Sequence, residues 1–236
     1  IAPMDPYPRP WGGRMLAPLA KPSPYCMRIL VADDHPIICV ALGEMLRAAF
    51  PDTHEGVATV EDSDTLLATL ADARCDLLVL DLFMPGALGS IPLLERVVAL
   101  RPGLPIVAYT GANQPMLAQQ ALSAGARAFV SKASGPESAM DAVRAVLAGQ
   151  AYVDPRIDLE AARHHPWHTL TPGERGVIVA LASGQHLHGI AIDSDRSYKT
   201  VTAHKYNALR KLKLNSKTDL KHYLSQIGLG YLLGCH

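Results

Sequence analysis

The sequence lacks the marks of a secreted or membrane-inserted protein. Its four cysteines, at positions 26, 39, 75 and 235, have no C-x-x-C spacing, and a chain of 236 residues needs no disulfides to stabilise a fold. No apolar run approaches the roughly 18–20 residues that cross a bilayer, and the N-terminus has no continuous hydrophobic signal core. We therefore expect a cytoplasmic protein with no membrane partner.

Net charge is also absent, because 22 Lys and Arg balance 22 Asp and Glu. As a total, this balance favours neither a nucleic-acid-binding protein nor an acidic one. The charges are unevenly distributed, however: residues 27–150 carry 8 basic and 14 acidic side chains, whereas residues 170–227 carry 9 basic and 4 acidic ones. This asymmetry indicates two modules with different partners, the second of which suits a polyanion.

The first residues are rich in proline. Seven prolines interrupt residues 1–26, and proline disfavours helices and removes a donor from β-ladders. We predict a disordered leader, or a remnant foreign to the folded protein, over residues 1–26, with the folded part beginning at Met27.

From Met27 onward, short apolar runs alternate with longer segments of helical period. The apolar runs are residues 28–32, 54–60, 76–82, 105–110 and 128–132. The helical segments are residues 36–50, 62–73, 89–100, 114–124 and 136–148. This alternation of βα units predicts an α/β domain over residues 27–149, a doubly wound (βα)5 sheet of flavodoxin-like order.

The rest of the chain follows a different pattern. Residues 150–169 mix proline, histidine and charge without a clear period, which predicts a linker with at most one short helix. A small all-α domain is expected over residues 170–227. Residues 228–236 are interpreted as a tail that the fold does not need.

Side chains capable of chemistry follow four of the predicted strands. Asp33 and Asp34 follow the first strand and Asp81 ends the third. Thr110 closes the fourth strand and Lys132 the fifth. Because the carboxyl ends of parallel strands meet at one edge, these residues should converge. Clustered carboxylates suit a divalent cation, with oxygen ligands favouring Mg²⁺. An isolated Asp after a strand is more often a helix cap, but this set indicates phosphoryl transfer to an aspartate.

Four segments around these residues carry a family resemblance, and DDHP followed by D-x-x-M-P-G is its most specific part. The segments are ILVADDHP (29–36), LLVLDLFMPG (77–86), IVAYTGA (106–112) and AFVSKAS (128–134). They resemble the receiver domain of two-component response regulators, in the NarL/FixJ subfamily. The resemblance covers the predicted sheet, residues 27–149.

The resemblance implies a role for each residue at this edge. Asp81 is the expected phosphoacceptor, and Lys132 is expected to pair with the phosphoryl group. Thr110 would move toward that group while Phe129, three residues before the lysine, changes rotamer. The implied Mg²⁺ ligands are Asp34 directly, Asp33 through water, Asp81, and the main-chain carbonyl of Phe83.

Two positions depart from the family pattern. Phe83 stands where the family often has a polar residue, and Ala112, two residues after Thr110, is also apolar. Both positions lie where an attacking water would be oriented, so we expect slow self-dephosphorylation.

The basic C-terminal segment carries a second resemblance. LTPGER (170–175) and SYKTVTAHKYNALRKLKLNSKTDL (197–220) resemble the LuxR-type helix-turn-helix, with a spacing close to the BvgA and RcsB branch. Ser197 can cap a helix that runs to about Leu212 with Val201 and Ala208 facing inward. Such an amphipathic recognition helix suits the major groove and its flanking phosphates. The predicted DNA-binding residues are Ser197, Lys199, Thr200, Thr202, His204, Lys205, Arg210 and Lys211.

The preceding helix departs from the family pattern. GQHLHGIA (184–191) replaces the usual G-x-[ST]-N-K-E-I-A, and Ser194 and Arg196 stand where the family has core aliphatic residues. A buried aliphatic is worth ~2 kcal/mol or more, so the first helices of this domain are expected to be loose or rearranged.

The favoured function is a DNA-binding transcriptional regulator controlled by phosphorylation. A sensor histidine kinase would phosphorylate Asp81 with Mg²⁺, and the protein would dimerise on promoter DNA. No enzymatic activity is expected beyond self-phosphotransfer and autodephosphorylation at Asp81. RNA polymerase or a partner regulator is a further candidate partner. The alternative is a phosphorylation-dependent interaction switch whose degenerate helix-turn-helix binds a partner regulator instead of DNA.

Overall fold

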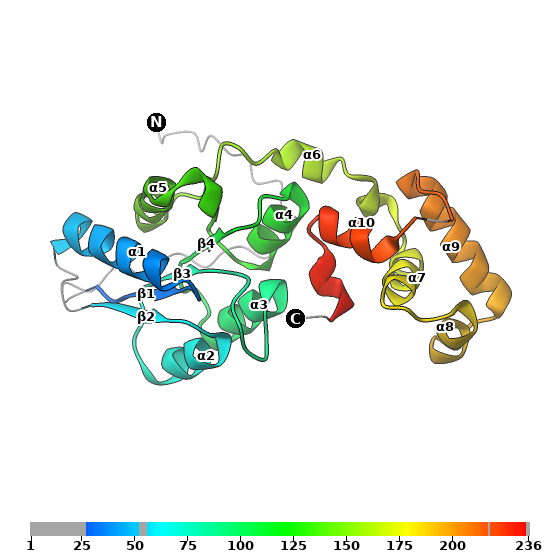
Figure 1. The fold of residues 1–236 in the computed structure, drawn as a ribbon, viewed down its shortest axis with the longest axis horizontal. Helices are drawn as coiled ribbons and strands as arrows, with labels where there is room; N and C mark the ends of the chain where they lie inside the picture. The colour runs from blue at the N-terminus through cyan, green and yellow to red at the C-terminus, as the bar shows by residue number, and fades with distance from the viewer. Residues whose placement is uncertain (1–26, 52–55, 217, 235–236) are drawn as a thin grey trace, which may run out of the picture.

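The computed structural model describes residues 27–51, 56–216 and 218–234 (Figure 1). The predicted leader, residues 1–26, lies outside the described residues. Figure 1 shows an α/β domain and a helical domain at opposite ends, with α6 and the C-terminal segment between them. None of the helices in these ranges has the length and apolar character needed to cross a bilayer.

The N-terminal domain is built on a parallel sheet with the strand order β2-β1-β3-β4-β5-β6. The strands are β1 (Ile29–Ala32), β2 (Val57–Val60), β3 (Leu77–Leu80), β4 (Ile106–Thr110), β5 (Ala128–Ser131) and β6 (Tyr152–Val153). The helices that follow β1 to β5 are α1 (Pro36–Ala49), α2 (Ser63–Asp72), α3 (Ser90–Leu100), α4 (Pro115–Ala124) and α5 (Pro136–Leu147). A short 3-10 turn, η2 (Lys132–Ser134), precedes α5. The predicted doubly wound fold is confirmed.

The core of this domain has two halves, one on each face of the sheet. Helices α2, α3 and α4 cover one face, where Leu94 and Leu117 pack on Leu80 and Phe129. Helices α1 and α5 cover the other face, where Leu42 and Val143 join the second half. Strands β1, β3, β4 and β5 are buried throughout, which explains why they appear in the sequence as continuous apolar runs.

The sheet has one strand more than the five predicted. Tyr152 and Val153 pair in parallel with Ala128 and Phe129, so the segment interpreted as a linker begins by extending the sheet. Two residues carry no periodicity, which is why the sequence pattern misses this strand. The remainder contains α6 (Leu159–Arg163) and a 3-10 turn, η3 (Pro166–Thr169), that buries Trp167.

The C-terminal domain consists of α7 (Pro172–Ala182), α8 (Leu187–Asp193), α9 (Tyr198–Leu212), α10 (Leu220–Gln226) and a final 3-10 turn, η4 (Gly230–Leu233). Thr171 and Glu174 form a capping box at the start of α7. Ser197 accepts a hydrogen bond from the amide of Thr200, as predicted for the start of the recognition helix. Val201, Ala208 and Leu212 face inward as predicted.

Two expectations for this domain are wrong. Ser194 and Arg196 are exposed, so neither leaves a hole in the core, and α8 forms with Ile190 and Ala191 buried. The segment interpreted as a tail also contributes to the core, because Leu229 is 1% exposed. Of that segment, residues 235–236 lie outside the described residues.

Candidate functional site

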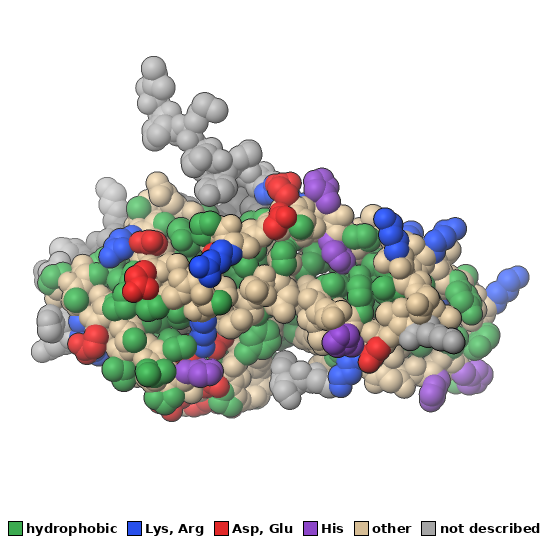
Figure 2. All heavy atoms as spheres, turned by 45° about the horizontal axis from the view of Figure 1, so that its top comes forward, with side chains coloured by type: hydrophobic (Ala, Val, Ile, Leu, Met, Phe, Trp, Pro, Cys, Tyr) green, Lys and Arg blue, Asp and Glu red, His purple; other side chains and the backbone are tan. Residues whose placement is uncertain are grey.

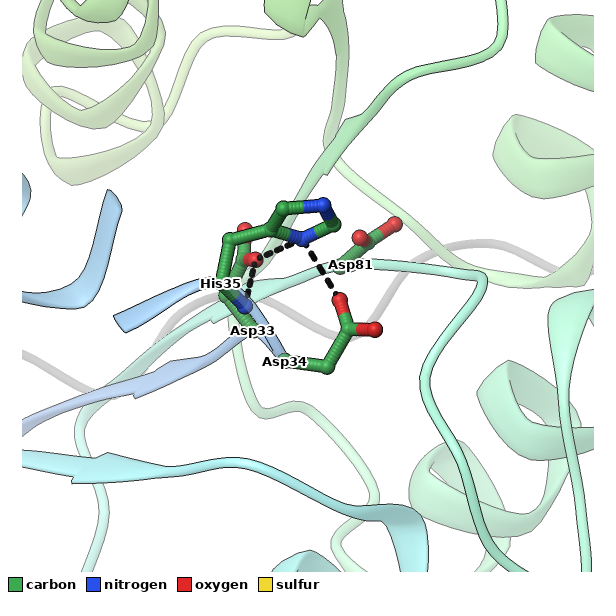
Figure 3. A group of neighbouring side chains, drawn as sticks. All are labelled: Asp33, Asp34, His35 and Asp81. Atoms are coloured by element: carbon green, nitrogen blue, oxygen red, sulfur yellow. Dashed lines mark hydrogen bonds and ion pairs between the residues drawn. The ribbon is translucent and has the colours of Figure 1, made fainter. Parts of the chain in front are cut away.

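The acidic residues after β1 and β3 converge at one edge of the sheet, as expected. Figure 3 shows Asp33, Asp34 and Asp81 gathered around the ring of His35. Each of the four offers one ligand atom, and these atoms lie within 4.8 Å of one another. His35 was not among the predicted site residues. Its position directly after the two aspartates in the DDHP segment could have indicated it.

Lys132 holds the buried carboxylates of this cluster together. Its Nζ lies 2.6 Å from Oδ2 of Asp81 and 2.7 Å from Oδ2 of Asp33. Burial lowers the pKa of the ammonium, but hydrogen bonds to both carboxylates outweigh burial and raise it above its usual value. Lys132 is therefore charged at neutral pH, and it offsets the repulsion between two carboxylates that are only 2% and 3% exposed.

The second oxygen of Asp81 is held by the chain that follows it. The Phe83 amide donates a hydrogen bond of 3.1 Å to Oδ1 of Asp81. In the same way, the His35 amide donates to Oδ1 of Asp33 at 2.9 Å. Both carboxylates are thus oriented by backbone donors of their own loops, which fixes the cluster without any ligand.

His35 ties the more open part of the cluster together. Its Nδ1 lies 2.7 Å from Oδ1 of Asp34 and 3.2 Å from Oδ1 of Asp33. The carboxylate of Asp34 is 32% exposed, so this is the side from which solvent reaches the cluster. Three carboxylates with one open side form an oxygen-rich donor set that fits a hard divalent cation.

Thr110 and Phe129 lie on the neighbouring strands β4 and β5. Thr110 is fully buried, and its hydroxyl has no hydrogen-bond partner among the described residues. Phe129 is also fully buried, with its ring in the core below. Phe83 is 53% exposed, and Ala112 is half-buried against the same core half as Phe129. An unpaired buried hydroxyl is a costly feature, and it is available to an incoming acceptor.

The second candidate site is the outward face of α9. Figure 2 shows Lys and Arg side chains projecting from the end of the molecule that α9 forms, whereas most Asp and Glu side chains lie toward the other end. Of the predicted DNA-binding residues, Ser197, Lys199, Thr200 and Arg210 are exposed. The same face also presents residues that sequence reasoning missed, namely Ala203, Tyr206 and Asn207. Their helical spacing with Lys199 could have indicated them.

The other four predicted residues do not lie freely on this face. Lys211 Nζ is bound to Glu174 Oε2 at 2.7 Å and to the carbonyl of Thr169 at 3.0 Å. Lys211 therefore ties α9 to α7 in this structure, and its assignment to DNA binding stays a prediction. Of the others, all half-buried, His204 lies 3.3 Å from Arg196, and Lys205 lies over the ring of Tyr206. The fourth is Thr202, whose hydroxyl is buried.

Comparison with known families accounts for both domains. Residues 29–144 match the response regulator receiver domain, and residues 168–224 match the luxR family of bacterial regulatory proteins. The transcriptional regulatory protein UhpA of Salmonella typhimurium is 33% identical over 196 residues, which cover 82% of this chain and 95% of UhpA. The chain belongs to the NarL/FixJ family of response regulators. Like that family, it is a phosphorylation-dependent, DNA-binding transcription regulator.

Other response regulators and solved structures agree. The oxygen regulatory protein NreC of Staphylococcus carnosus is 27% identical, over 84% of this chain and 96% of NreC. A structure of two RcsB dimers bound to two parallel DNAs matches with a TM-score of 0.60 at 28% identity, covering 85% of this chain and 98% of RcsB. RcsB from Salmonella enterica serovar Typhimurium, bound to a promoter with the phosphomimetic BeF₃⁻, matches with a TM-score of 0.62 at 27% identity, covering 86% and 99%.

Proposed function

We propose that this response regulator receives a phosphoryl group from a sensor histidine kinase on the carboxylate of Asp81. The observation that carries the proposal is the pair of short contacts from Lys132 to Asp33 and Asp81. An ammonium bridging a buried nucleophile and a second carboxylate neutralises charge where a phosphoryl group would add more. A bond forms between a carboxylate oxygen of Asp81 and phosphorus, and the bond from phosphorus to the donor breaks.

Asp33, Asp34, Asp81 and the main-chain carbonyl of Phe83 would hold Mg²⁺. When bound, the ion supplies positive charge that neutralises the carboxylates and the phosphoryl oxygens. Lys132 supplies a further positive charge and hydrogen-bond donors to the phosphoryl oxygens. The backbone amide of Phe83 keeps Asp81 oriented for attack.

Thr110 and Phe129 would convert phosphorylation into a change of surface. The Thr110 hydroxyl, which has no partner among the described residues, moves to donate a hydrogen bond to a phosphoryl oxygen. That movement vacates space beside β4 and β5, and Phe129 changes rotamer in response. The residues after Thr110 then shift together with the start of α4.

The outward face of α9 would contact the major groove of promoter DNA. Lys199 and Arg210 contact phosphates or base edges, while Tyr206 and Asn207 lie between them on the same face. Two copies on a two-fold site bind more tightly than one, because the second contact is made at high effective concentration. A modest gain in dimerisation thus becomes a large gain in promoter occupancy.

The test compares wild type, Asp81→Asn and the control Asp141→Asn, whose exposed carboxylate lies on α5. Each protein is treated with Mg²⁺ and a small phosphoryl donor and then examined by intact mass and by sedimentation. We expect wild type and Asp141→Asn to gain one phosphoryl group and shift from monomer toward dimer, and Asp81→Asn to do neither. Phosphoryl uptake by Asp81→Asn would refute the assignment, and dimerisation that does not depend on Asp81 would refute the proposed link to assembly.

A further inference from the structure

The chain continues beyond the stretch that matches the luxR family into a segment that contacts the receiver domain. The match to the luxR family ends at residue 224, and we call residues Gly228–Leu233, which follow it closely, the latch. Helix α10 ends in a Schellman motif, in which the Leu229 amide bonds to the Leu224 carbonyl and the Gly228 amide bonds to the Ser225 carbonyl. Gly228 supplies the positive φ of 82° that this ending requires. The motif turns the chain into η4 and toward the receiver.

The latch packs against both domains at once. Leu229 is buried in the core of the LuxR-type domain, which also takes in Met116 from α4 of the receiver. Tyr231 packs against that core and against the receiver core half that contains α3 and α4. Burial and the nearby charge of Glu95 raise the pKa of Tyr231 to about 12, so its ring is a neutral, apolar contact at physiological pH. Figure 1 shows the latch between α3 and α7.

The closest contact is made to the first turn of α4. A Cβ atom on Gly228 would lie 2.8 Å from Cβ of Gln114 and 2.9 Å from Cβ of Leu117. The nearest atoms therefore belong to the backbone and to side-chain roots, which cannot rotate away. A displacement of this turn of α4 therefore alters its contact with Gly228.

The remainder of the contact between domains is less continuous. A cleft of about 530 Å³ opens beside the latch, between Gln120 of α4 and Val179 of α7. The linker adds a polar contact in which His168 lies 2.9 Å from Gln119 on α4. The apolar part of the attachment is shared, because Ala162 and Trp167 of the linker join the same buried cluster as Met116, while the latch adds Leu229 and Tyr231.

The position of this contact connects it to the phosphoacceptor site. Gln114 is the N-cap of α4 and lies four residues after Thr110, whose buried hydroxyl lacks a partner among the described residues. Lys199 and Arg210 remain exposed while the latch is packed. The latched arrangement therefore leaves the face of α9 uncovered but holds it in one fixed direction relative to the receiver.

We propose that the latch is a conformational device that fixes the LuxR-type domain to α3 and α4 of the receiver, and that displacement of the first turn of α4 on phosphorylation releases it. Release lets the LuxR-type domain reorient and pair with that of a second copy on DNA. The inference rests on the proposed function of Asp81. Thermodynamic linkage makes the coupling between latch release and phosphoryl binding reciprocal. If a phosphoryl mimic loosens the latch, loosening the latch must raise the affinity for the mimic by the same factor.

The test uses the full chain with Tyr231→Ala, with Tyr231→Phe as the conservative control, and with a truncation after Leu229 that keeps the Schellman motif. Beryllofluoride with Mg²⁺ is the phosphoryl mimic, and its affinity is measured by calorimetry. Promoter affinity is measured by fluorescence anisotropy without the mimic. Hydrogen exchange over residues 113–118 and 228–233 reports the latch directly and confirms that each variant is folded.

In wild type, beryllofluoride is expected to speed exchange in both segments. Tyr231→Ala and the truncation should show fast exchange without it, with promoter and beryllofluoride affinities raised about 5- to 150-fold, whereas Tyr231→Phe should match wild type. Faster exchange with both affinities unchanged would overturn the latch. If beryllofluoride changed neither exchange segment in wild type, the proposed phosphorylation switch would be refuted. The promoter affinities of wild type and Tyr231→Ala without the mimic would still decide whether the latch restrains DNA binding.

Discussion

The phosphoacceptor site and the outward face of α9 are opposite kinds of functional site. Asp33 and Asp81 are buried, paired with Lys132 and oriented by backbone amides before any ligand arrives. Lys199 and Arg210, in contrast, project into solvent at the other end of the molecule. The sheet sets the geometry of the phosphoacceptor site before any ligand binds. The exposed cations of α9 would instead take up their binding geometry on contact with DNA. Charges of the same type should therefore contribute to stability in the first site and to binding in the second.

The largest expected effect is on the stability of the receiver. Lys132→Met leaves two adjacent buried carboxylates without their counter-charge, which should cost about 3–5 kcal/mol of unfolding free energy. Urea unfolding followed by circular dichroism measures it. Lys199→Met, the same change on the exposed face, should stay within about 0.5 kcal/mol of wild type. Adding Asp81→Asn to Lys132→Met should recover part of the loss, and a double variant no more stable than the single one would contradict the pairing.

The next effect sharpens the other side of the comparison. Lys199→Ala combined with Arg210→Ala should weaken promoter binding by about 10- to 100-fold and lower the salt dependence by about one ion per lost phosphate contact. Stability should be unchanged because both side chains are exposed. Anisotropy titrations at several salt concentrations give both quantities, with Lys221→Ala on α10 as the matched control. An equal loss in the control would show only a general charge effect.

The contrast also explains what the sequence could predict. The strand ends were predictable because continuous apolar runs define a parallel sheet, and such a sheet brings Asp33, Asp81 and Lys132 to one edge whatever the loops do. On α9, helical spacing predicted the buried stripe at Val201 and Ala208 correctly. It did not separate Lys211, which reaches back to Glu174 on α7, from the cations that face outward. That distinction depends on a neighbouring helix and not on period.

A third effect concerns the opening of the phosphoacceptor site to water. Phe83 is half-exposed at its rim and offers no group to orient an attacking water. Phe83→Asp should shorten the lifetime of the phosphorylated protein by about tenfold, less than the roughly 10²-fold at the lower end for a positioned general base, because no partner would hold the introduced carboxylate in place. The decay of the phosphorylated form by intact mass measures it, with Phe83→Leu as the apolar control. A lifetime of seconds in wild type would itself refute the expectation of slow dephosphorylation.

The features that sequence reasoning missed share one physical cause. Strand β6 has two residues, and the latch has six, so neither is long enough to show a period. Tyr231 and Leu229 resemble a loose apolar tail until the receiver helix α4 lies beside them. Contacts between distant short segments depend on the assembled fold, and a single sequence carries no local signal for them.

The smallest expected effect concerns the charge pair of Glu174 and Lys211. In burial this pair lies between the phosphoacceptor site and the exposed cations of α9. Glu174 is buried, and burial alone would raise the pKa of its carboxyl group. Hydrogen bonds from Lys211 and Thr171 outweigh burial, so the pKa of Glu174 is lowered from its usual value. A lowered carboxyl pKa stabilises the folded state above the unfolded value and loses that contribution as pH falls through the folded value. Glu174→Gln should therefore cost about 1 kcal/mol near neutral pH, with the difference from wild type disappearing as the pH falls through the lowered folded pKa of Glu174.

The fluorescence of buried Trp167 reports the unfolding of this domain, in a Trp11→Phe background that removes the second tryptophan. Lys211→Met should reproduce the loss near neutral pH, because it removes the same pair from the other side. If the difference between Glu174→Gln and wild type persisted unchanged at acidic pH, the contribution would come from packing and not from charge. The charge of Lys211 would then contribute nothing to the attachment of α9 to α7.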